Sequence, residues 1–247
     1  MDDGSRDGTA GLLREFAERM PERVEVLQLP ENRGKAEAVR QGVLQGSLRS
    51  TTRYLGYWDA DLATPLGEAA VFEALLESRH HVAVAMGSRV QMLGRRIERS
   101  PLRHYVGRVF ATCASWVLRL PVYDTQCGAK LFRNEPAVRG VFAEPFSSRW
   151  VFDVEWLARL LCSGGGPTEI HEVPLRRWRD VAGSKVGAMD LPRALVGLWR
   201  IYRKYGGGLR HAHRAGHGPC PIGSARYGGG PAPGRRPAVG STSAAPT

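Results

Sequence analysis

The chain has 247 residues, of which 35 are Lys or Arg and 24 are Asp or Glu, so its formal net charge is +11. This length allows one large domain or two small ones and can bury a substantial core. The four cysteines lie far apart and form no C-x-x-C pair, which argues against a disulfide framework or a zinc knuckle and fits a reducing cytosol. The longest apolar stretch, 104–123, is interrupted by two arginines, and the first residues are acidic, so we expect neither a transmembrane helix nor a signal peptide.

Helical and strand patterns alternate over the first third of the chain. We expect helices over residues 7–20, 34–45 and 65–78 and strands over residues 24–29, 53–58 and 81–86. Such alternation is typical of an α/β protein with a parallel sheet, in which ligands bind beyond the carboxyl ends of the strands. Polar side chains follow two of these strand ends, at residues 59–61 and 87–89, so we expect both ends to face one cleft.

The first residues of the chain are typical of a loop that follows a strand of a sheet. Residues 2–5, Asp-Asp-Gly-Ser, have the composition of a loop that leaves a strand, yet no strand precedes them. We therefore expect either a truncated chain or a true start upstream, and an α/β sheet that lacks its first strand.

Two later stretches, 102–120 and 189–205, are amphipathic and carry aromatic side chains beside arginines. Basic faces with interfacial aromatics suit an anionic membrane surface. The alternative is that these apolar stripes pack on the core, and for the first helix this alternative is the stronger one.

The last 42 residues differ in composition from the rest. Residues 206–247 contain eleven glycines, six prolines and five arginines but no acidic residue. Such a segment buries too little apolar surface to offset the entropy of ordering, so we expect an ordered domain over 1–205 and a disordered basic tail over 206–247. The tail either only keeps the chain soluble or contacts nucleic acid or anionic lipid.

The Asp59-Ala60-Asp61 triplet follows the strand predicted at 53–58. Its two carboxylates are spaced to share one hard cation, and Mg²⁺ or Mn²⁺ prefers such oxygen ligands while keeping room for substrate phosphates. Taken alone the pattern is weak, because two acidic residues on a loop are more often solvated charges.

Several ordered motifs together strengthen the metal interpretation. They are residues 2–9, 32–36, 59–61, 87–89, 124–132, 149–155, 172–174 and 183–185. Through these motifs the chain resembles the family 2 glycosyltransferases of GT-A fold, and its second half is most similar to polyprenyl-phosphate sugar transferases of the dolichyl-phosphate glucosyltransferase type. The resemblance spans roughly residues 2–205 and is most specific at 124–132.

The resemblance implies an inverting transfer of a hexose from a nucleotide diphosphate sugar to a polyprenyl phosphate, with Mg²⁺ or Mn²⁺ as cofactor. It places the protein at the cytoplasmic face of a membrane as a peripheral protein, with no specific nucleic-acid partner. Ala63 stands where the mannose-transferring branch often has a glutamine, which favours glucose, so UDP-glucose comes before GDP-mannose as the expected donor. Ala129 replaces a usual aromatic residue, and the family's first strand and Pro-Ala-Tyr-Asn-Glu loop have no counterpart.

The family's motifs also imply roles for individual side chains. On the donor side these are Asp2 and Asp3 for base and ribose, Lys35 on the nucleotide-facing loop, Asp59 for ribose or metal, Asp61 for metal, and Ser184 and Lys185 over the diphosphate. On the acceptor side these are Arg89 and Arg103 as a phosphate clamp, Asp124 as a catalytic residue and Asp153 as a base.

Structural roles compete with several of these assignments. Arg89 and Arg103 could be ordinary surface charges, and Asp124 could simply turn the chain before a strand at 130–132. Asp153 could favour a helix start through the helix dipole. Cys127 is better explained as a small buried side chain than as a nucleophile.

Two other classes of protein remain open at this point. A sugar nucleotidyltransferase shares the architecture and metal chemistry but needs a glycine-rich basic loop after its first strand. A truncated non-catalytic copy, or an arginine-rich nucleic-acid binder acting through phosphates alone, is the third possibility.

Overall fold

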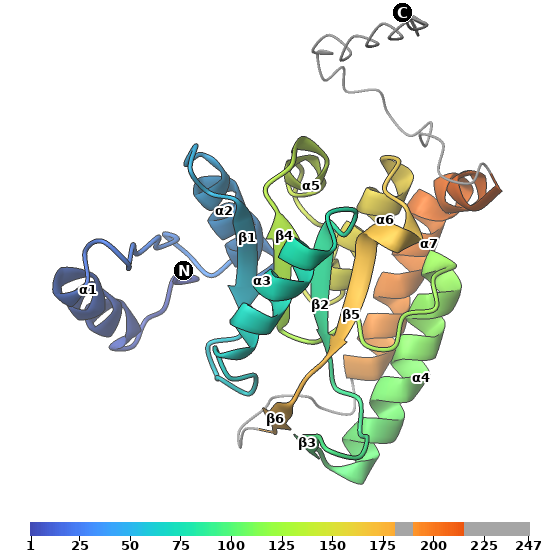
Figure 1. The fold of residues 1–247 in the computed structure, drawn as a ribbon, viewed down its shortest axis with the longest axis horizontal. Helices are drawn as coiled ribbons and strands as arrows, with labels where there is room; N and C mark the ends of the chain where they lie inside the picture. The colour runs from blue at the N-terminus through green and yellow to red at the C-terminus, as the bar shows by residue number, and fades with distance from the viewer. Residues whose placement is uncertain (181–189, 215–247) are drawn as a thin grey trace, which may run out of the picture.

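The computed structural model describes residues 1–180 and 190–214. Its centre is a four-stranded sheet in the order β1-β4-β2-β5 (Figure 1). The strands are β1 (Tyr54–Trp58), β2 (Val84–Ser88), β4 (Ala129–Arg133) and β5 (Ile170–Pro174). A small second sheet pairs β3 (Arg96–Glu98) with β6 (Arg177–Arg179). The α/β class predicted from the sequence is confirmed.

The sheet is mixed, so the prediction of a parallel sheet is wrong. Strands β2 and β5 are parallel, but β4 runs antiparallel to both β1 and β2. The cause is the segment before β4, which returns the chain to the edge where β1 ends: the Asp59 N–H donates to the Gly128 carbonyl at 2.9 Å. A strand that enters the sheet at this edge has to run against β1 and β2.

The strand predicted over residues 24–29 is also absent from the structure. Only one parallel bridge forms there, between Asp2 and Gln28. The Asp2 N–H donates to the Leu27 carbonyl at 2.8 Å, and the Leu29 N–H donates to the Asp2 carbonyl at 2.9 Å. A strand needs a partner over several residues, and here the partner is a single residue.

Helices cover both faces of the central sheet. These helices are α2 (Lys35–Ser47), α3 (Glu68–Ser78), α4 (Pro101–Leu118), α5 (Pro136–Val141), α6 (Phe152–Cys162) and α7 (Asp190–Arg214). Helix α1 (Thr9–Arg19) precedes them in the chain, and a 3-10 turn lies at Pro167–Glu169. Helix α4 begins where the Ser100 side chain accepts the Arg103 N–H, and it ends at Arg119, which has a φ of 54°. The helices predicted over 7–20, 34–45 and 65–78 are confirmed within a few residues.

The core forms two clusters, one on each face of the sheet. The larger lies among α2, α4, α5, α6 and α7 and includes Trp156, Phe132 and Phe142. The smaller lies beneath α3 and includes Phe72 and Leu76. Strand β2 runs between the two clusters and is buried at every residue, as expected for the middle of a three-layer protein.

Helix α1 stands apart from these layers, at the left of Figure 1. None of its residues is buried, and its apolar stripe of Leu12 and Phe16 is exposed. Helix α7, in contrast, continues past the boundary predicted at residue 205. Residues 206–214, which we expected to be disordered, are helical, and Leu209 is buried; residues 215–247 lie outside the described part.

Among the described helices, none is both long enough and apolar enough to cross a bilayer.

Phe132 tests how strongly the central packing holds the fold. Its side chain is fully buried and lies edge-on to Phe142 and Trp156, at ring distances of 5.5 and 5.2 Å. We expect Phe132→Ala to lower the free energy of unfolding by about 3–5 kcal/mol, because it removes buried apolar surface and leaves a cavity. Urea unfolding followed by circular dichroism measures this loss.

The control Trp116→Ala removes a side chain that is 88% exposed and should change stability by roughly 0.5 kcal/mol or less. Equal losses for the two variants would contradict the packing described.

Candidate active site

The polar side chains predicted to act together meet at one edge of the sheet. Asp59 follows the end of β1, Arg89 follows the end of β2, and Gly128 immediately precedes β4. The antiparallel pairing of Trp58 with Ala129 brings Asp59 next to Gly128. The loop before β4 is thus a third segment at the edge where the two strand ends were predicted to meet.

Asp59 is fixed in this edge from two sides. Lys35, the first residue of α2, places its Nζ 2.5 Å from Asp59 Oδ1. The carboxylate also lies against the Cα of Gly128, where any side chain would collide with it. A glycine is thus required at position 128 for Asp59 to lie where it does, and this requirement explains one glycine of the 124–132 motif.

Asp61 lies on the exposed turn that follows β1. Its Oδ1 accepts the Ala63 N–H at 3.0 Å, and Leu62 between them has a φ of 54°. Asp59 and Asp61, two residues apart, both offer carboxylate oxygens. These oxygens fit a hard divalent cation that takes its remaining ligands from water and a diphosphate. Within the described residues, no three acidic, histidine or cysteine side chains converge on a common point.

Asp2 and Asp3 organise the loop that leads into α2. The two oxygens of Asp3 accept the N–H groups of Arg33 and Gly34, each at 2.8 Å. Asp2 is 2% exposed; its Oδ1 accepts the Ser5 N–H at 3.2 Å, and its buried Oδ2 has no hydrogen-bond partner among the described residues. Asp3 therefore acts first as an anchor of the loop, and a ligand role for either residue stays a prediction.

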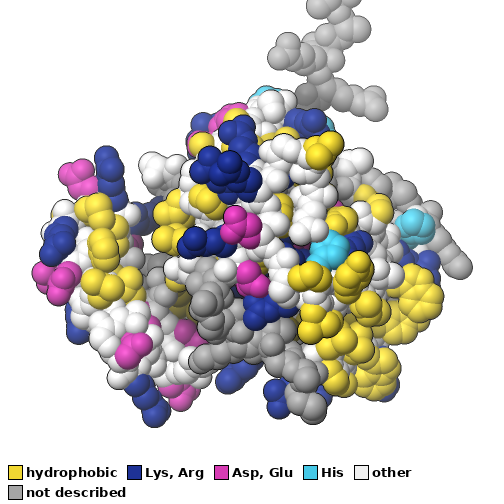
Figure 2. Space-filling view, turned by 90° about the horizontal axis from the view of Figure 1, so that it is seen from below, with side chains coloured by type: hydrophobic (Ala, Val, Ile, Leu, Met, Phe, Trp, Pro, Cys, Tyr) yellow, Lys and Arg dark blue, Asp and Glu magenta, His cyan; other side chains and the backbone are white. Residues whose placement is uncertain are grey.

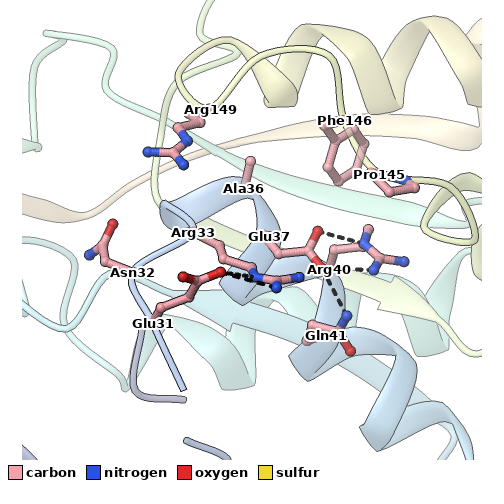
Figure 3. A pocket seen from close by; sticks show the side chains of 10 residues that line it. All are labelled: Glu31, Asn32, Arg33, Ala36, Glu37, Arg40, Gln41, Pro145, Phe146 and Arg149. Carbon is pink, nitrogen blue, oxygen red and sulfur yellow. Dashed lines mark hydrogen bonds and ion pairs between the residues drawn. The ribbon is translucent and has the colours of Figure 1, made fainter. Parts of the chain in front are cut away.

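A cleft of about 510 Å³ opens beside this loop (Figure 3). Arg33 and Glu31 lie on one side of it, bonded to each other at 3.1 Å, and Arg149 lies on the other, as Figure 3 shows. The stem of Arg149 packs over Gly34, whose φ is 91°. The cleft is lined by Glu31, Asn32, Arg33, Ala36, Glu37, Arg40, Gln41, Pro145, Phe146 and Arg149.

Arg89 and Asp124 form a buried bidentate ion pair. Arg89 Nε and Nη2 lie 2.6 and 2.8 Å from the two oxygens of Asp124, and the Arg89 backbone N–H donates to the same carboxylate. Burial alone would raise the pKa of Asp124, but the charge and hydrogen bonds of Arg89 outweigh it and hold this pKa at about 2. Sequence reasoning assigned both residues to the site without foreseeing that they bind each other.

Glu172 on β5 holds the backbone of the segment that carries Asp124. Its carboxylate accepts the backbone N–H groups of Tyr123 and Asp124, at 2.7 and 2.8 Å. Burial raises the pKa of Glu172. Arg103 is held by another acid, with its Nη1 2.5 Å from Asp180 Oδ1.

Asp153 and Lys130 form a second buried ion pair, on the opposite side of β4. Lys130 is fully buried, and its Nζ lies 2.7 Å from Asp153 Oδ1 and 2.5 Å from the Cys127 carbonyl. The Tyr57 hydroxyl donates to the same carboxylate oxygen, and burial followed by the charge of Asp153 raises the pKa of Tyr57 well above 10. Asp153 stands in the first turn of α6, where the helix-start role was expected.

Cys127 is fully buried, and burial raises the pKa of its thiol, which fits the small buried side chain predicted for it. Ser184 and Lys185, predicted to close over the diphosphate, lie outside the described residues.

A family model described as "Glycosyl transferase family 2" matches residues 1–139, more than half of the chain. The chain therefore belongs to glycosyl transferase family 2.

Curated relatives narrow the resemblance further. The chain is 31% identical over 213 residues to a dolichyl-phosphate beta-glucosyltransferase of Trichomonas vaginalis, covering 85% of this chain and 60% of that protein. It is 34% identical over 220 residues to the dolichyl-phosphate beta-glucosyltransferase of Drosophila melanogaster, covering 81% and 64%. The chain thus spans about three fifths of the length of these relatives.

Among solved structures, glucosyl-3-phosphoglycerate synthase from Mycobacterium tuberculosis, in complex with uridine-diphosphate, shares the fold. The match has a TM-score of 0.50 and 16% identity, and it covers 81% of this chain and 66% of that one. At this identity the likeness concerns the fold alone.

The pH dependence of stability tests the Arg89–Asp124 pair. Because the pKa of Asp124 lies below its ordinary value of 3.8, the ionised form stabilises the folded state. We expect Asp124→Asn to lower the free energy of unfolding by about 2 kcal/mol at neutral pH, with this deficit shrinking as the pH falls from about 4 toward 2. Urea unfolding at a series of pH values measures it. Glu22→Gln, a change at an exposed turn residue, is the control. A deficit that does not vary with pH would contradict the ion pair.

Proposed function

We propose that this protein transfers a hexose from a nucleotide diphosphate sugar to a polyprenyl phosphate, with inversion at the anomeric carbon. Glucose from UDP-glucose is the favoured substrate and GDP-mannose the second. The observation that carries the proposal is the meeting of Asp59, Asp61 and Arg89 at one edge of the sheet. Identities of about 30% to dolichyl-phosphate beta-glucosyltransferases support the choice of sugar and acceptor.

The two sides of the reaction fall to different residues. On the donor side Asp59 and Asp61 would hold Mg²⁺ or Mn²⁺, which supplies positive charge to the leaving diphosphate. Lys35, bound to Asp59, adds a further positive charge beside the diphosphate. On the acceptor side the arginines attract and orient a phosphate, so the two anionic substrates meet in a fixed geometry.

A strong general base is not required for this reaction. A phosphate monoester has a second pKa near 6, so its attacking oxygen is already ionised at neutral pH. Asp153 remains a predicted base, yet its ion pair with Lys130 supports a structural contribution as well. Removing one partner of a buried ion pair is costly, so loss of activity in an Asp153 variant has to be separated from loss of folding.

The acceptor is a lipid, and helix α4 offers a surface for it. Phe110, Ala114 and Leu118 face the core, whereas Tyr105 and Trp116 are 71% and 88% exposed. One side of this helix therefore packs on the core, as the alternative interpretation expected, and its exposed aromatic side chains support the proposed membrane contact. Figure 2 shows hydrophobic side chains gathered on the right of this view.

Helix α7 packs against α4 and adds to the same kind of surface. Ala194, Leu198 and Ile201 are buried, and the exposed side chains of α7 include Val196, Trp199 and Tyr202. Arginines interrupt these apolar stripes, and Arg203 lies over the Trp199 ring. We propose that α4 and α7 rest on the cytoplasmic face of an anionic membrane.

The activity is tested directly with the full chain and geranylgeranyl phosphate as acceptor. UDP-glucose and GDP-mannose are offered separately with Mg²⁺ or Mn²⁺, and the glycosylated lipid is detected by mass spectrometry. We expect product from UDP-glucose first. Pyrophosphate released from UTP and glucose 1-phosphate would instead identify a nucleotidyltransferase, and no turnover of any pair would favour a non-catalytic copy.

Asp61→Asn tests the donor side of the proposal. The asparagine Oδ1 can still accept the Ala63 N–H, so the turn should persist, but the neutral amide is a poor ligand for a divalent cation. We expect at least a hundredfold loss of transfer, corresponding to roughly 3 kcal/mol or more of transition-state stabilisation. Glu73→Gln, at an exposed residue of α3, should keep parental activity. A rate above about a tenth of the parent would contradict the metal assignment, since tenfold is only about 1.4 kcal/mol.

Vesicle binding tests the α4 surface. We expect Tyr105→Ser combined with Trp116→Ser to weaken sedimentation with anionic phospholipid vesicles by about tenfold, because two interfacial aromatics are lost. Leu48→Ser, which changes a side chain 77% exposed at the end of α2, is the matched control. Equal binding by parent and double variant would contradict the proposed surface.

A further inference from the structure

Three arginines surround the beginning of helix α4, and they differ in what they bind. Arg89 uses Nε and Nη2 for its bidentate pair with Asp124. Arg103 is bound to Asp180 through Nη1. Each of these arginines already has an acidic partner, so much of its capacity to hold a ligand phosphate is taken up within the protein.

Within the described part of the chain, Arg99 has no such partner. It follows β3 directly and precedes the Ser100 cap of α4, and its side chain is partly buried. The guanidinium packs on Gly107 of α4, at a place where any larger residue would collide with it. No ion pair or hydrogen bond joins its guanidinium to any side chain that the structure describes within residues 1–180 and 191–213.

The charge around Arg99 is not balanced by its neighbours. Burial, and next the positive charge of Arg89, lower the pKa of Arg99, and the smaller opposing effects of Asp124 and Asp180 do not outweigh them. Both acids are already engaged by Arg89 and Arg103. A partly desolvated cation beside another cation is unfavourable, and an added anion would relieve both costs.

We propose that Arg99 is the principal ligand of the acceptor's phosphate monoester, with Arg89 and Arg103 beside it. This inference rests on the proposed function and identifies the residue that binds the acceptor. Arg99 offers the planar set of donors that matches phosphate oxygens in a bidentate manner. Arg89, tied to Asp124, then contributes mainly position and charge.

The surroundings of Arg99 favour a lipid phosphate over a donor diphosphate. Leu102 and Tyr105, within two turns of α4, are 74% and 71% exposed. A phosphate at Arg99 therefore has apolar side chains close by to contact a prenyl chain. The expected donor ligands come from other segments. Lys35 is the first residue of α2, and Asp61 follows the end of β1.

Binding measurements with the full chain test this assignment without depending on turnover. Isothermal titration uses three probes, namely geranylgeranyl phosphate, inorganic phosphate and UDP, against Arg99→Ala, Arg99→Lys and the control Arg96→Ala. Arg96 is an exposed arginine on the same strand, β3. Thermal melts establish that each variant is folded, and Arg99→Lys serves if Arg99→Ala does not fold.

We expect Arg99→Ala to weaken geranylgeranyl phosphate binding by about tenfold or more and Arg99→Lys to weaken it less, because lysine keeps the charge but loses the bidentate geometry. Arg96→Ala should bind geranylgeranyl phosphate within about twofold of the parent, and Arg99→Ala should bind UDP within about twofold of the parent.

The other outcomes separate this inference from the proposed function. Parental binding of geranylgeranyl phosphate by Arg99→Ala would overturn the role of Arg99 while leaving the acceptor class intact. Loss of UDP binding to the same extent would overturn it in favour of a donor contact. Binding of inorganic phosphate that depends on Arg99, without binding of the lipid phosphate by the parent, would keep the anion site but overturn the lipid acceptor. A parent that binds neither phosphate overturns both.

Discussion

The buried ammonium group of Lys130 is the contact on which the arrangement of the site depends. It joins Asp153 in α6 to the Cys127 carbonyl in the loop before β4, and it lies 5.3 Å from the ring centre of Tyr57 on β1. A buried charge has to be paired and hydrogen-bonded to be tolerated, so these groups cannot separate without large cost. The loop held in this way carries Gly128, against which Asp59 lies. The position of Asp59, a proposed metal ligand, thus depends on a buried ion pair that it does not itself contact.

A second ion pair lies at the same edge of the sheet, where we propose that the acceptor binds. Asp124, held by Glu172 through the backbone of residues 123–124, binds Arg89 with both oxygens. Arg89 also lies over the ring of Trp178 in β6, which ties the small sheet to the large one. Arg89 and Arg103 are each held by an acidic residue, so in the proposed site Arg99 offers its positive charge to the phosphate. Fixed charges of this kind need little reorganisation when charge develops in a reaction.

Helices α4 and α7 show how one element can serve both core and surface. Each has one apolar face packed inward and a second apolar face left exposed. On α7, Arg203 lies over the ring of the exposed Trp199, and α4 begins two residues after Arg99. In the proposed function, the surface that meets the membrane and the residue that meets the lipid phosphate are thereby parts of one continuous segment, 99–118.

Local pattern alone determined the alternation of helices and strands, and with it the α/β class, the end of β1, and the placement of Asp59, Asp61 and Arg89 after strand ends, because periodicity and turn residues act over a few neighbours. The end of β2 lies at Ser88, two residues beyond the predicted one. The family followed from ordered motifs. Only the tertiary structure decided that β4 runs antiparallel, that residues 24–29 form no strand, and that residues 206–214 extend α7, since each depends on partners distant in the sequence. The same holds for the pairing of Arg89 with Asp124 and of Lys130 with Asp153, and for Arg99, which has no acidic partner among the side chains that the structure describes. A charged residue looks alike in any local pattern, and its role is set by which opposite charge the fold brings to it and how much water the fold removes.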